Sequence, residues 1–568
     1  MSGKSILFGQ SYYLRFDPKL WAAMMPYPPL GTLYAASVMR ERGYEVYLFD
    51  AMLAESERDW EAEIQRIHPA YAVLFEDNFN YLSKMCLLRM REAASSMIGM
   101  AKAHGCRVIV CGADASDHPE LYLTRGADFA LIGEGEVTLV ELLDFLENQN
   151  GETQTRILDS PILDSPILDS PTLDSPTLDS PTLDSPILDS PILDSPILDS
   201  SILDSSLLPP GLAWLSADRP GQVERTPKRP EIKDLDRLPF PAWDLVDVEN
   251  YRRIWIDRHG YFSMNMATTR GCPYHCNWCA KPIWGQRYNV RSPQNVVQEL
   301  DWLRDHYRPD HIWFADDIFG LKPGWLQEFA RLVRKSSTIS PYKCLSRVDL
   351  LLRQGEVEAL RDSGAEIVWV GAESGSQEIL NSMEKGTQID QIYAAARLVR
   401  KAGIRIGFFL QFGYPGEGLE DIEKTRRMVS EIMPDDIGIS VSYPLPGTKF
   451  YAKVLDQLGE KKNWYDSNDL AMMYRGPFSS AFYRQLHKVV HKEFRLRRNW
   501  QDLTGGILMP ETRRGGVFKK SAVTIYQAIT LPFDRRELSR LENIPHQPIL
   551  PLESGMSLEE AARPTPQG

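Results

Sequence analysis

The chain has 568 residues, of which 43% are hydrophobic and 25% are charged. This composition is typical of a globular protein and excludes collagen-like, wholly disordered and disulfide-stapled chains. The net charge is −13, but ten of the aspartates lie in one repeat at residues 157–206, so the rest of the chain is nearly neutral. A neutral folded part does not indicate nucleic-acid binding. Because the sequence also lacks a signal peptide and a membrane-length apolar run, we expect a soluble, cytoplasmic protein with no transmembrane segment.

The N-terminal region, residues 1–150, alternates short apolar strands with helix-length segments such as Leu30–Arg42 and Val137–Asn148. This alternation predicts an α/β domain with a doubly wound parallel sheet, whose ligands bind at the carboxyl ends of the strands. The predicted strands are Ser5–Gly9, Glu45–Phe49, Ala70–Phe75, Arg107–Gly112 and Phe129–Gly133.

A low-complexity segment follows, and we interpret residues 151–241 as a linker. Residues 157–206 repeat a pentapeptide that reads ILDSP or TLDSP, with ILDSS in the last two units. A period of five matches neither a helix nor a strand, and the prolines remove helix donors. The repeat is therefore typical of an extended spacer, with an array of partner-binding motifs as the alternative. A Pro-rich stretch, residues 209–241, continues it.

A second strand–helix alternation covers the next region, residues 242–450, and predicts a partial or complete (β/α) barrel. The C-terminal region, residues 451–568, is predicted to be mainly helical with an irregular tail. Its aromatic and basic segment, Trp464–Asn499, has the spacing of an amphipathic helix that packs on the barrel, although RNA binding is an alternative. The predicted barrel strands are Phe262–Thr269, His311–Ala315, Lys343–Val348, Glu366–Val370, Arg405–Phe412 and Asp436–Ser442.

The strongest chemical signal is a loop with three cysteines, Cys272, Cys276 and Cys279, directly after the first predicted barrel strand. Three thiolates at the spacing C-x₃-C-x₂-C can hold one iron–sulfur cluster, for which cysteine is the usual ligand. Three ligands for four irons would leave one iron open, as a reactive cluster requires. A structural zinc site is the alternative, but it needs a fourth ligand, and His275 inside the loop is badly placed for this role.

This loop resembles the signature of the radical S-adenosylmethionine (SAM) superfamily, C-x₃-C-x-aromatic-C, with Trp278 at the aromatic position. In that superfamily the cysteines hold a [4Fe-4S] cluster, SAM binds the fourth iron, and cleavage of SAM gives a 5′-deoxyadenosyl radical. Five further segments follow in the order of the superfamily: FADDIF at 314–319, SRVD at 346–349, GAESGS at 371–376, FGYPGE at 412–417 and YPLPGT at 443–448.

The resemblance implies a set of SAM contacts at the ends of the barrel strands. A carboxylate such as that of Glu373 can accept hydrogen bonds from the amino group or ribose of SAM, and Arg347 can bind its carboxylate in a fork geometry. Glycines allow the backbone to approach the nucleoside closely. The implied contact residues are Trp278, Asp316, Arg347, Gly371, Glu373, Ser374 and Gly413.

The N-terminal region resembles the cobalamin-binding domain that precedes the barrel in class B radical SAM enzymes. The resemblance rests on the segments 28–36, 43–46, 110–116 and 133–138. A doubly wound domain that binds another nucleotide, or nothing, is the alternative. The implied cobalamin contacts are Leu30, Gly31, Thr32, Gly112, Asp114, Gly133, Glu134, Gly135 and Glu136.

Many cobalamin domains carry the motif D-x-H-x-x-G, whose histidine binds the lower face of cobalt. The motif is missing from residues 1–150, and the nearest match, at 257–262, lies outside this region. We therefore expect cobalamin to bind without a histidine on cobalt. His104 and His118 are interpreted as surface or capping residues.

Together these patterns predict an enzyme, a cobalamin-dependent radical SAM methyltransferase that acts on an unactivated carbon of a small-molecule, lipid or tetrapyrrole-type substrate. The resemblance implies an electron donor such as flavodoxin or ferredoxin as a partner. One alternative is a radical oxidative cyclase or rearrangement enzyme, similar to the anaerobic Mg-protoporphyrin monomethyl ester cyclases. A second alternative, from a different class, is a non-catalytic cobalamin or redox sensor.

Overall fold

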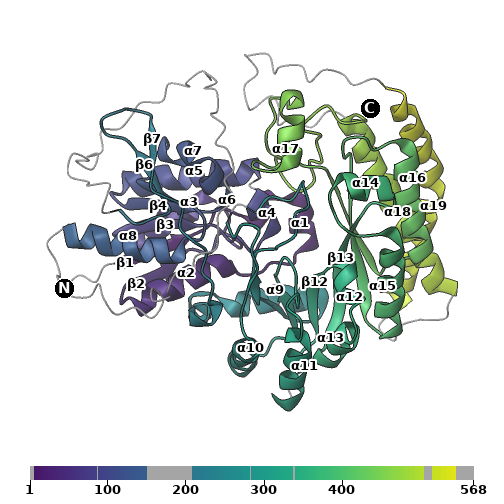
Figure 1. The fold of residues 1–568 in the computed structure, drawn as a ribbon, viewed down its shortest axis with the longest axis horizontal. Helices are drawn as coiled ribbons and strands as arrows, with labels where there is room; N and C mark the ends of the chain where they lie inside the picture. Colours follow the sequence, from purple (N-terminus) through teal and green to yellow (C-terminus); the bar gives the residue numbers. More distant parts are fainter. Residues whose placement is uncertain are drawn as a thin grey trace.

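The computed structural model describes residues 5–85, 87–149, 208–281, 283–336, 339–504 and 514–544. The pentapeptide repeat, predicted to be a spacer, lies outside the described residues. Two sheets organise the described chain, one in each half, with helices on their faces (Figure 1).

The first sheet has seven strands in the order β2-β1-β3-β4-β5-β6-β7. Its first five strands are parallel and confirm the predicted doubly wound domain. Their bounds are β1 Ser5–Gly9, β2 Glu45–Leu48, β3 Tyr71–Phe75, β4 Arg107–Cys111 and β5 Phe129–Leu131. The helices of this half are α1 Pro18–Ala23, α2 Leu30–Glu41, α3 Glu57–Ile67, α4 Tyr81–Met85, α5 Leu88–Ala103, α6 Ala113–Asp117, α7 Pro119–Leu123 and α8 Glu136–Gln149.

Two strands of this sheet were not predicted. β6 (Leu212–Leu215) pairs with β5, and β7 (Val223–Arg225) pairs with β6, both in antiparallel orientation. They fall in the Pro-rich stretch that we interpreted as a linker. Both are short and flanked by proline and glycine, so the local composition conceals them, whereas the pairing edge that β5 offers is a tertiary feature.

The second sheet has six parallel strands in the order β15-β14-β13-β12-β11-β8, which is a half-barrel. The strands are β8 Ser263–Met266, β11 His311–Phe314, β12 Tyr342–Ser346, β13 Ala365–Glu373, β14 Arg405–Phe412 and β15 Asp436–Val441. A small antiparallel pair, β9 Thr269–Arg270 and β10 Asn289–Val290, flanks the cysteine loop. The helices are α9 Val248–His259, α10 Pro293–Tyr307, α11 Trp325–Ser336, α12 Val348–Leu351, α13 Glu356–Ser363, α14 Gln377–Ser382, α15 Ile389–Lys401, α16 Leu419–Ile432 and α17 Lys449–Val454.

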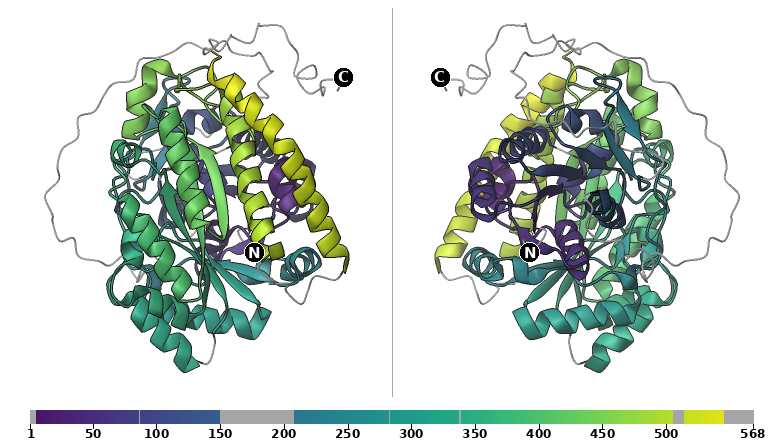
Figure 2. Two further views of the ribbon diagram at one scale, coloured as in Figure 1. Left: turned by 90° about the vertical axis from the view of Figure 1, so that its right-hand side faces the viewer. Right: turned by 90° about the vertical axis from the view of Figure 1, so that its left-hand side faces the viewer.

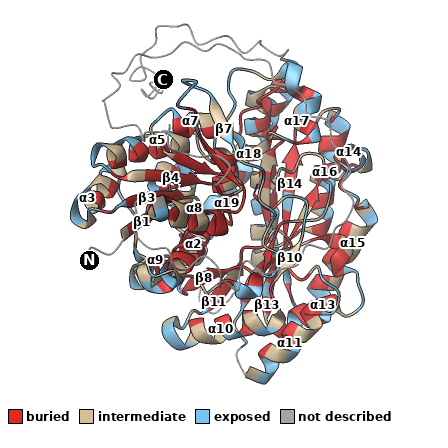
Figure 3. Cartoon of the chain, turned by 60° about the vertical axis from the view of Figure 1, so that its left-hand side comes forward, coloured by how far each residue is buried: buried red, intermediate tan, exposed pale blue. Residues whose placement is uncertain are grey.

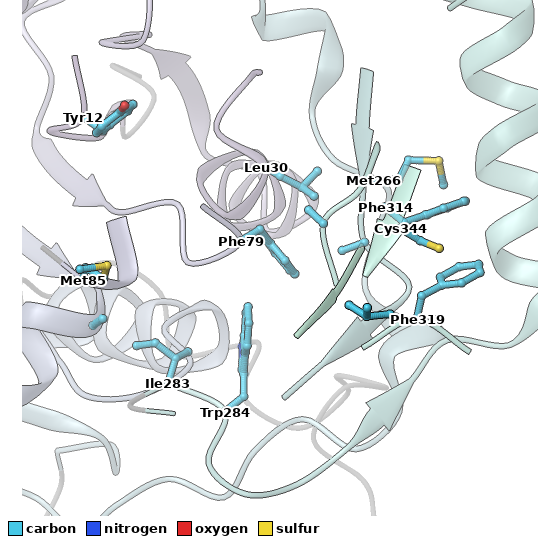
Figure 4. Packing of buried hydrophobic residues seen from close by; sticks show 14 of the residues in the cluster. Tyr12, Leu30, Phe79, Met85, Met266, Ile283, Trp284, Phe314, Phe319 and Cys344 are labelled. Atoms are coloured by element: carbon cyan, nitrogen blue, oxygen red, sulfur yellow. The ribbon is translucent and has the colours of Figure 1, made fainter. Parts of the chain in front are cut away.

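Parallel strands covered by helices are buried on both faces, and they consequently consist of near-continuous apolar runs. All five residues of β3 are buried, and Figure 3 shows both sheets as largely buried. A hydrophobic cluster continues from one half of the chain into the other. In Figure 4 it includes Leu30 and Phe79 from the first half and Met266 and Phe314 from the second.

The C-terminal region forms two long helices, α18 (Ser480–Thr504) and α19 (Arg514–Glu542), which lie side by side on the outside of the molecule (Figure 2). Helix α18 contacts α16 and β15, as expected for a helix that packs on the barrel. It begins only at residue 480, so the first part of the predicted helix is not helical. The predicted irregular tail is also wrong for residues 514–542, where α19 continues through Pro532. No described helix is apolar and long enough to cross a membrane.

Candidate active site between the two sheets

The carboxyl ends of the two sheets face each other. Arg270, at the end of the first barrel strands, forms ion pairs with Glu134 (3.0 Å) and Glu136 (2.7 Å) in the segment after β5. Lys84, in α4 after β3, forms an ion pair of 2.6 Å with Asp317, which follows β11. Ligands of parallel α/β sheets bind at these ends, so the two binding edges share one space.

The three cysteines of the loop lie close to one another. Cys276 is buried, whereas Cys272 and Cys279 are partly buried. Burial, together with the charges of Asp317, Cys272 and Cys276 and against the opposing effect of Lys281, raises the pKa of Cys279 to about 12. Within the described ranges, no three His, Cys, Asp or Glu side chains converge as ligands of a single metal ion do. Three thiols are the usual ligand set of an iron–sulfur cluster and are one ligand short of a tetrahedral structural zinc site, so the chemistry of the donors fits a cluster.

Arg347 packs against the cysteine loop. Its guanidinium lies 3.7 Å from the ring centroid of Tyr274, between the first two cysteines. Its Nε donates to Asp349 (2.9 Å) and its Nη2 to the carbonyl of Lys385 (3.1 Å). These contacts hold the Arg347 side chain in a fixed orientation beside the loop. A guanidinium needs such an orientation to bind a carboxylate through two parallel hydrogen bonds.

Glu373 sits on a β-bulge at the end of β13. The register with β14 shifts between Gly371 and Glu373, and Glu373 has a φ of +57°. A left-handed conformation at a glutamate costs about 1–3 kcal/mol and occurs mainly at functional sites. The bulge re-aims the side chain, which accepts a hydrogen bond of 2.8 Å from Lys385. A Cβ on Gly371 would lie only 2.3 Å from the Glu373 carboxylate, so this pair requires glycine there.

Lys385 connects this carboxylate to the cysteine loop. Burial lowers the pKa of Lys385, but the charges of Glu373 and Cys276 outweigh it, and the pKa is raised. Its ammonium lies 5.9 Å from the ring centroid of Trp278. The indole Nε1 of Trp278 is buried and has no hydrogen-bond partner among the described residues. An unpaired buried donor costs about 1–3 kcal/mol, so it marks a place for a ligand acceptor.

The other implied SAM contacts make hydrogen bonds within the protein. Asp316 accepts from the backbone amides of Thr268 (2.7 Å) and Thr269 (2.9 Å), and burial raises its pKa to about 6. Ser374 contacts Thr425 at 3.2 Å. The amide of Gly413 donates to Glu417. These residues support the strand ends instead of presenting free side chains.

The implied cobalamin contacts are also largely engaged within the protein. The amide of Gly31 donates to Asp77 (3.0 Å), and the hydroxyl of Thr32 donates to the carbonyl of Phe75 (2.6 Å). Leu30 is fully buried, and Asp114 is ion-paired with Arg91 at 2.6 Å.

The glycines on this edge are tightly surrounded. A Cβ on Gly112 would lie 2.8 Å from Glu76, and one on Gly135 would lie 2.4 Å from the sulfur of Cys111. Gly133 has a φ of +85°, and its amide donates to Ser116 at 3.0 Å.

Arg270 is almost fully buried, with a side-chain exposure of 3%. Its guanidinium lies 5.6–6.0 Å from the ring centroids of Tyr34, Phe79 and Trp284. Phe79 and Trp284 approach each other across the two halves, with ring centroids 4.9 Å apart (Figure 4). The carboxylates of Glu134 and Glu136, two of the implied cobalamin contacts, pair with Arg270, which fixes the cysteine loop to the first domain.

Several polar atoms at the strand ends of the first sheet are buried without a partner among the described residues. Burial raises the pKa of Glu76 to about 7 and that of Asp77 to about 6, so this edge is largely shielded from water. Unpaired polar atoms in such a place fit a polar cofactor that would supply their partners. They are Gln10 Nε2, Tyr12 Oη, Asn78 Oδ1 and Ser83 Oγ.

Tyr81 projects from α4 into the space between the sheets. Its side chain is 55% exposed, yet the charges of Cys279 and Glu373 add to desolvation in raising its pKa. Sequence reasoning missed Tyr81, Lys385 and Lys84, because none of them lies in a recognisable motif. Glu76 and Asp77, two acidic residues directly after β3, were the one local signal in the sequence that pointed to the carboxyl end of the first sheet.

Comparison with known proteins identifies the barrel. Residues 266–429 match the family model described as the Radical SAM superfamily. The match confirms the resemblance inferred from the cysteine loop.

Two curated relatives show the same similarity in sequence. Uncharacterized methyltransferase PH0819 of Pyrococcus horikoshii is 28% identical over 50% of this chain and 62% of its own length. Anaerobic magnesium-protoporphyrin IX monomethyl ester cyclase of Rubrivivax gelatinosus is 28% identical over 45% of this chain and 44% of its own. The chain thus spans about half the length of these relatives.

Two solved structures share the fold of both halves. The radical SAM methyltransferase TsrM of Kitasatospora setae, solved with cobalamin and a [4Fe-4S] cluster bound, has a TM-score of 0.57 and 17% identity over 80% of this chain and 78% of that one. The cobalamin-dependent radical SAM enzyme OxsB, solved with aqua-cobalamin, has a TM-score of 0.62 and 16% identity over 94% and 72%. At these identities the likeness confirms the predicted fold class.

Proposed function

We propose that the chain is a cobalamin-dependent radical SAM methyltransferase that methylates an unactivated carbon. The observation that carries the proposal is the meeting of two strand-end edges, one with three neighbouring thiols and one with buried unpaired polar atoms. When bound, a [4Fe-4S] cluster supplies the electron that cleaves SAM, and cobalamin carries the methyl group.

The residues of the barrel edge would divide the work of holding the cluster and SAM. Cys272, Cys276 and Cys279 would bind three irons. Glu373, aimed by the bulge, would accept from the SAM amino group, and Arg347 would bind its carboxylate. The ammonium of Lys385 donates a hydrogen bond of 2.8 Å to Glu373, which holds this carboxyl group beside the cysteine loop. The polar edge of the first sheet would hold cobalamin.

An anaerobic reconstitution tests the cluster assignment. We expect about four irons per chain, the content of one cysteine-held [4Fe-4S] cluster. Cys276→Ala should lose the cluster and SAM cleavage, whereas Cys344→Ala, a buried thiol in β12, should keep both. A Cys276→Ala variant with full SAM cleavage would refute the assignment, and a wild-type chain that never cleaves SAM would favour a sensor.

The methyl-transfer step needs a separate test, because the second curated relative is named as a cyclase. SAM with a deuterated methyl group should transfer the label to a product that mass spectrometry detects in extracts. Products with a new ring and no label would favour an oxidative cyclase instead.

We further propose that cobalt carries no protein imidazole. In the described first domain, His68 is exposed, His104 contacts Glu61 at the surface, and His118 pairs with Glu120. Paramagnetic resonance of the cobalt(II) form checks this, since an axial nitrogen splits each cobalt line into three. A threefold splitting that persists with imidazole-free cobinamide would contradict the proposal.

A further inference from the structure

Helix α19 carries an apolar face that points away from the molecule. Five large side chains on it are exposed between 42% and 72%. Ile525, Ile529 and Phe533 follow the spacing i, i+4, i+8, which places them on one side of a helix. We call this set the outer apolar face: Val523, Ile525, Tyr526, Ile529 and Phe533. Contiguous exposed apolar side chains of this kind mark an interaction site.

The opposite side of α19 faces inward and combines buried leucines such as Leu531 with buried polar side chains. Asp534 is buried and pairs with Lys488 (2.8 Å) and Lys492 of α18. Gln485 donates to the carbonyl of the same residue at 2.8 Å. A buried aspartate with two ammonium partners fixes the rotation of the helix, since any other rotation would leave these charges unpaired. The outward direction of the apolar face is therefore determined by the polar contacts of α19.

The helix pair is strongly basic. Helices α18 and α19 contain twelve Lys and Arg residues and five Asp and Glu residues, in a chain whose net charge is −13. Arg536 and Arg540 are exposed beyond the C-terminal end of the outer apolar face. An exposed apolar face next to a basic flank is the pattern of helices that lie in the interface of an anionic membrane.

We propose that the α18–α19 pair docks on an anionic phospholipid surface, with α19 parallel to the surface and its outer apolar face in the acyl boundary. Charge complementarity selects this occupant. A second copy of the chain would bring two basic helix pairs together, and their like charges would repel. Spanning the bilayer is a different arrangement, for which no described helix is apolar enough.

Vesicle cosedimentation of the full chain tests the proposal. We expect binding to mixed phosphatidylcholine–phosphatidylglycerol vesicles, weaker binding to pure phosphatidylcholine, and loss of binding in high salt. The triple variant Ile525→Ser, Ile529→Ser, Phe533→Ser should stay in the supernatant. A matched control, Leu121→Ser, Ile256→Ser, Leu455→Ser, removes exposed apolar side chains elsewhere and should sediment like the wild type. Arg536→Gln should weaken binding about fivefold.

Two results would overturn the proposal. One is a wild-type chain that stays in the supernatant with every vesicle while its circular dichroism shows a folded protein. The other is a concentration-dependent dimer in sedimentation velocity that the triple variant abolishes, with no vesicle binding by either protein. That result would assign the face to a second copy. The experiment needs no bound cofactor, so its outcome is independent of the proposed methyl transfer.

Discussion

Replacing Arg270 by methionine should destabilise the protein strongly, because its guanidinium forms the ion pairs of two buried carboxylates. Glu134 and Glu136 have side-chain exposures of 3% and 5%. Removing one member of a buried ion pair leaves an uncompensated charge and typically costs 3–5 kcal/mol. We therefore expect Arg270→Met to lower the free energy of unfolding at pH 8 by about 3–5 kcal/mol.

The loss should depend on pH with a defined sign. Burial and the neighbouring Glu136 raise the pKa of Glu134 to about 7, even though Arg270 lowers it. Without the guanidinium this pKa rises further. A raised carboxyl pKa means that stability is present at low pH and is lost as the pH rises through the folded-state pKa. The deficit of Arg270→Met should therefore be largest above pH 7 and shrink toward pH 5.

Urea unfolding followed by circular dichroism at pH 8 and pH 5 measures both quantities. Arg426→Met is a matched control, because its ion pair with Glu493 is partly exposed and should contribute less than about 1 kcal/mol. Adding Glu134→Gln and Glu136→Gln to Arg270→Met removes the uncompensated charges and should recover much of the loss. A deficit below about 1 kcal/mol, or one that is equal at both pH values, would refute the reasoning.

Three further predictions concern other parts of the chain. Gly371→Ala should weaken SAM binding at least about tenfold in equilibrium dialysis, because the new Cβ would collide with Glu373, whereas Gly99→Ala, in open space, should not. Burial raises the pKa of Glu417 to about 8, so the free energy of unfolding falls as the pH rises from 4.5 to 8 and the carboxyl group ionises more readily in the unfolded chain. Glu417→Gln removes this group and should therefore flatten the pH dependence of the unfolding free energy. Shortening the pentapeptide repeat to two units should leave cofactor loading within about threefold of wild type, since each halving of loop length changes the closure free energy by about 0.6 kcal/mol.

The parallel strands of both sheets could be predicted because each is a short apolar run between turn residues. The predicted strand Arg405–Phe412 matches β14 residue for residue. The cysteine loop was recognisable because its ligands are close together in sequence. Features that depend on local pattern are therefore the ones that the sequence reveals.

The polar network of the site could not be predicted, because it pairs residues far apart in sequence. Arg270 and Glu134 are separated by 136 positions, and no periodicity connects them. Lys385 follows a helix in a segment with no motif, and only the β-bulge at Glu373 brings the acid to it. The face of α19 was missed for a related reason: the side of α19 that faces inward is set by the ion pairs of Asp534 with α18, and not by the order of its own residues.

The contacts between the two halves favour a rigid relation between the two sheets during turnover. The indole N–H of Trp255 donates to the backbone carbonyl of Pro26 (2.7 Å). The side-chain amide of Asn265 donates to the backbone carbonyl of Pro28 (2.9 Å), and both hydrogen bonds are buried. With the Arg270 ion pairs and the continuous hydrophobic cluster, opening the interface would expose apolar surface and unpaired charges together. We therefore expect amide hydrogen exchange at β8 and the start of α2 to be as slow as in the centres of the sheets. Fast exchange of both segments as one unit would instead demonstrate a hinge, and substrate would then enter by separation of the two halves.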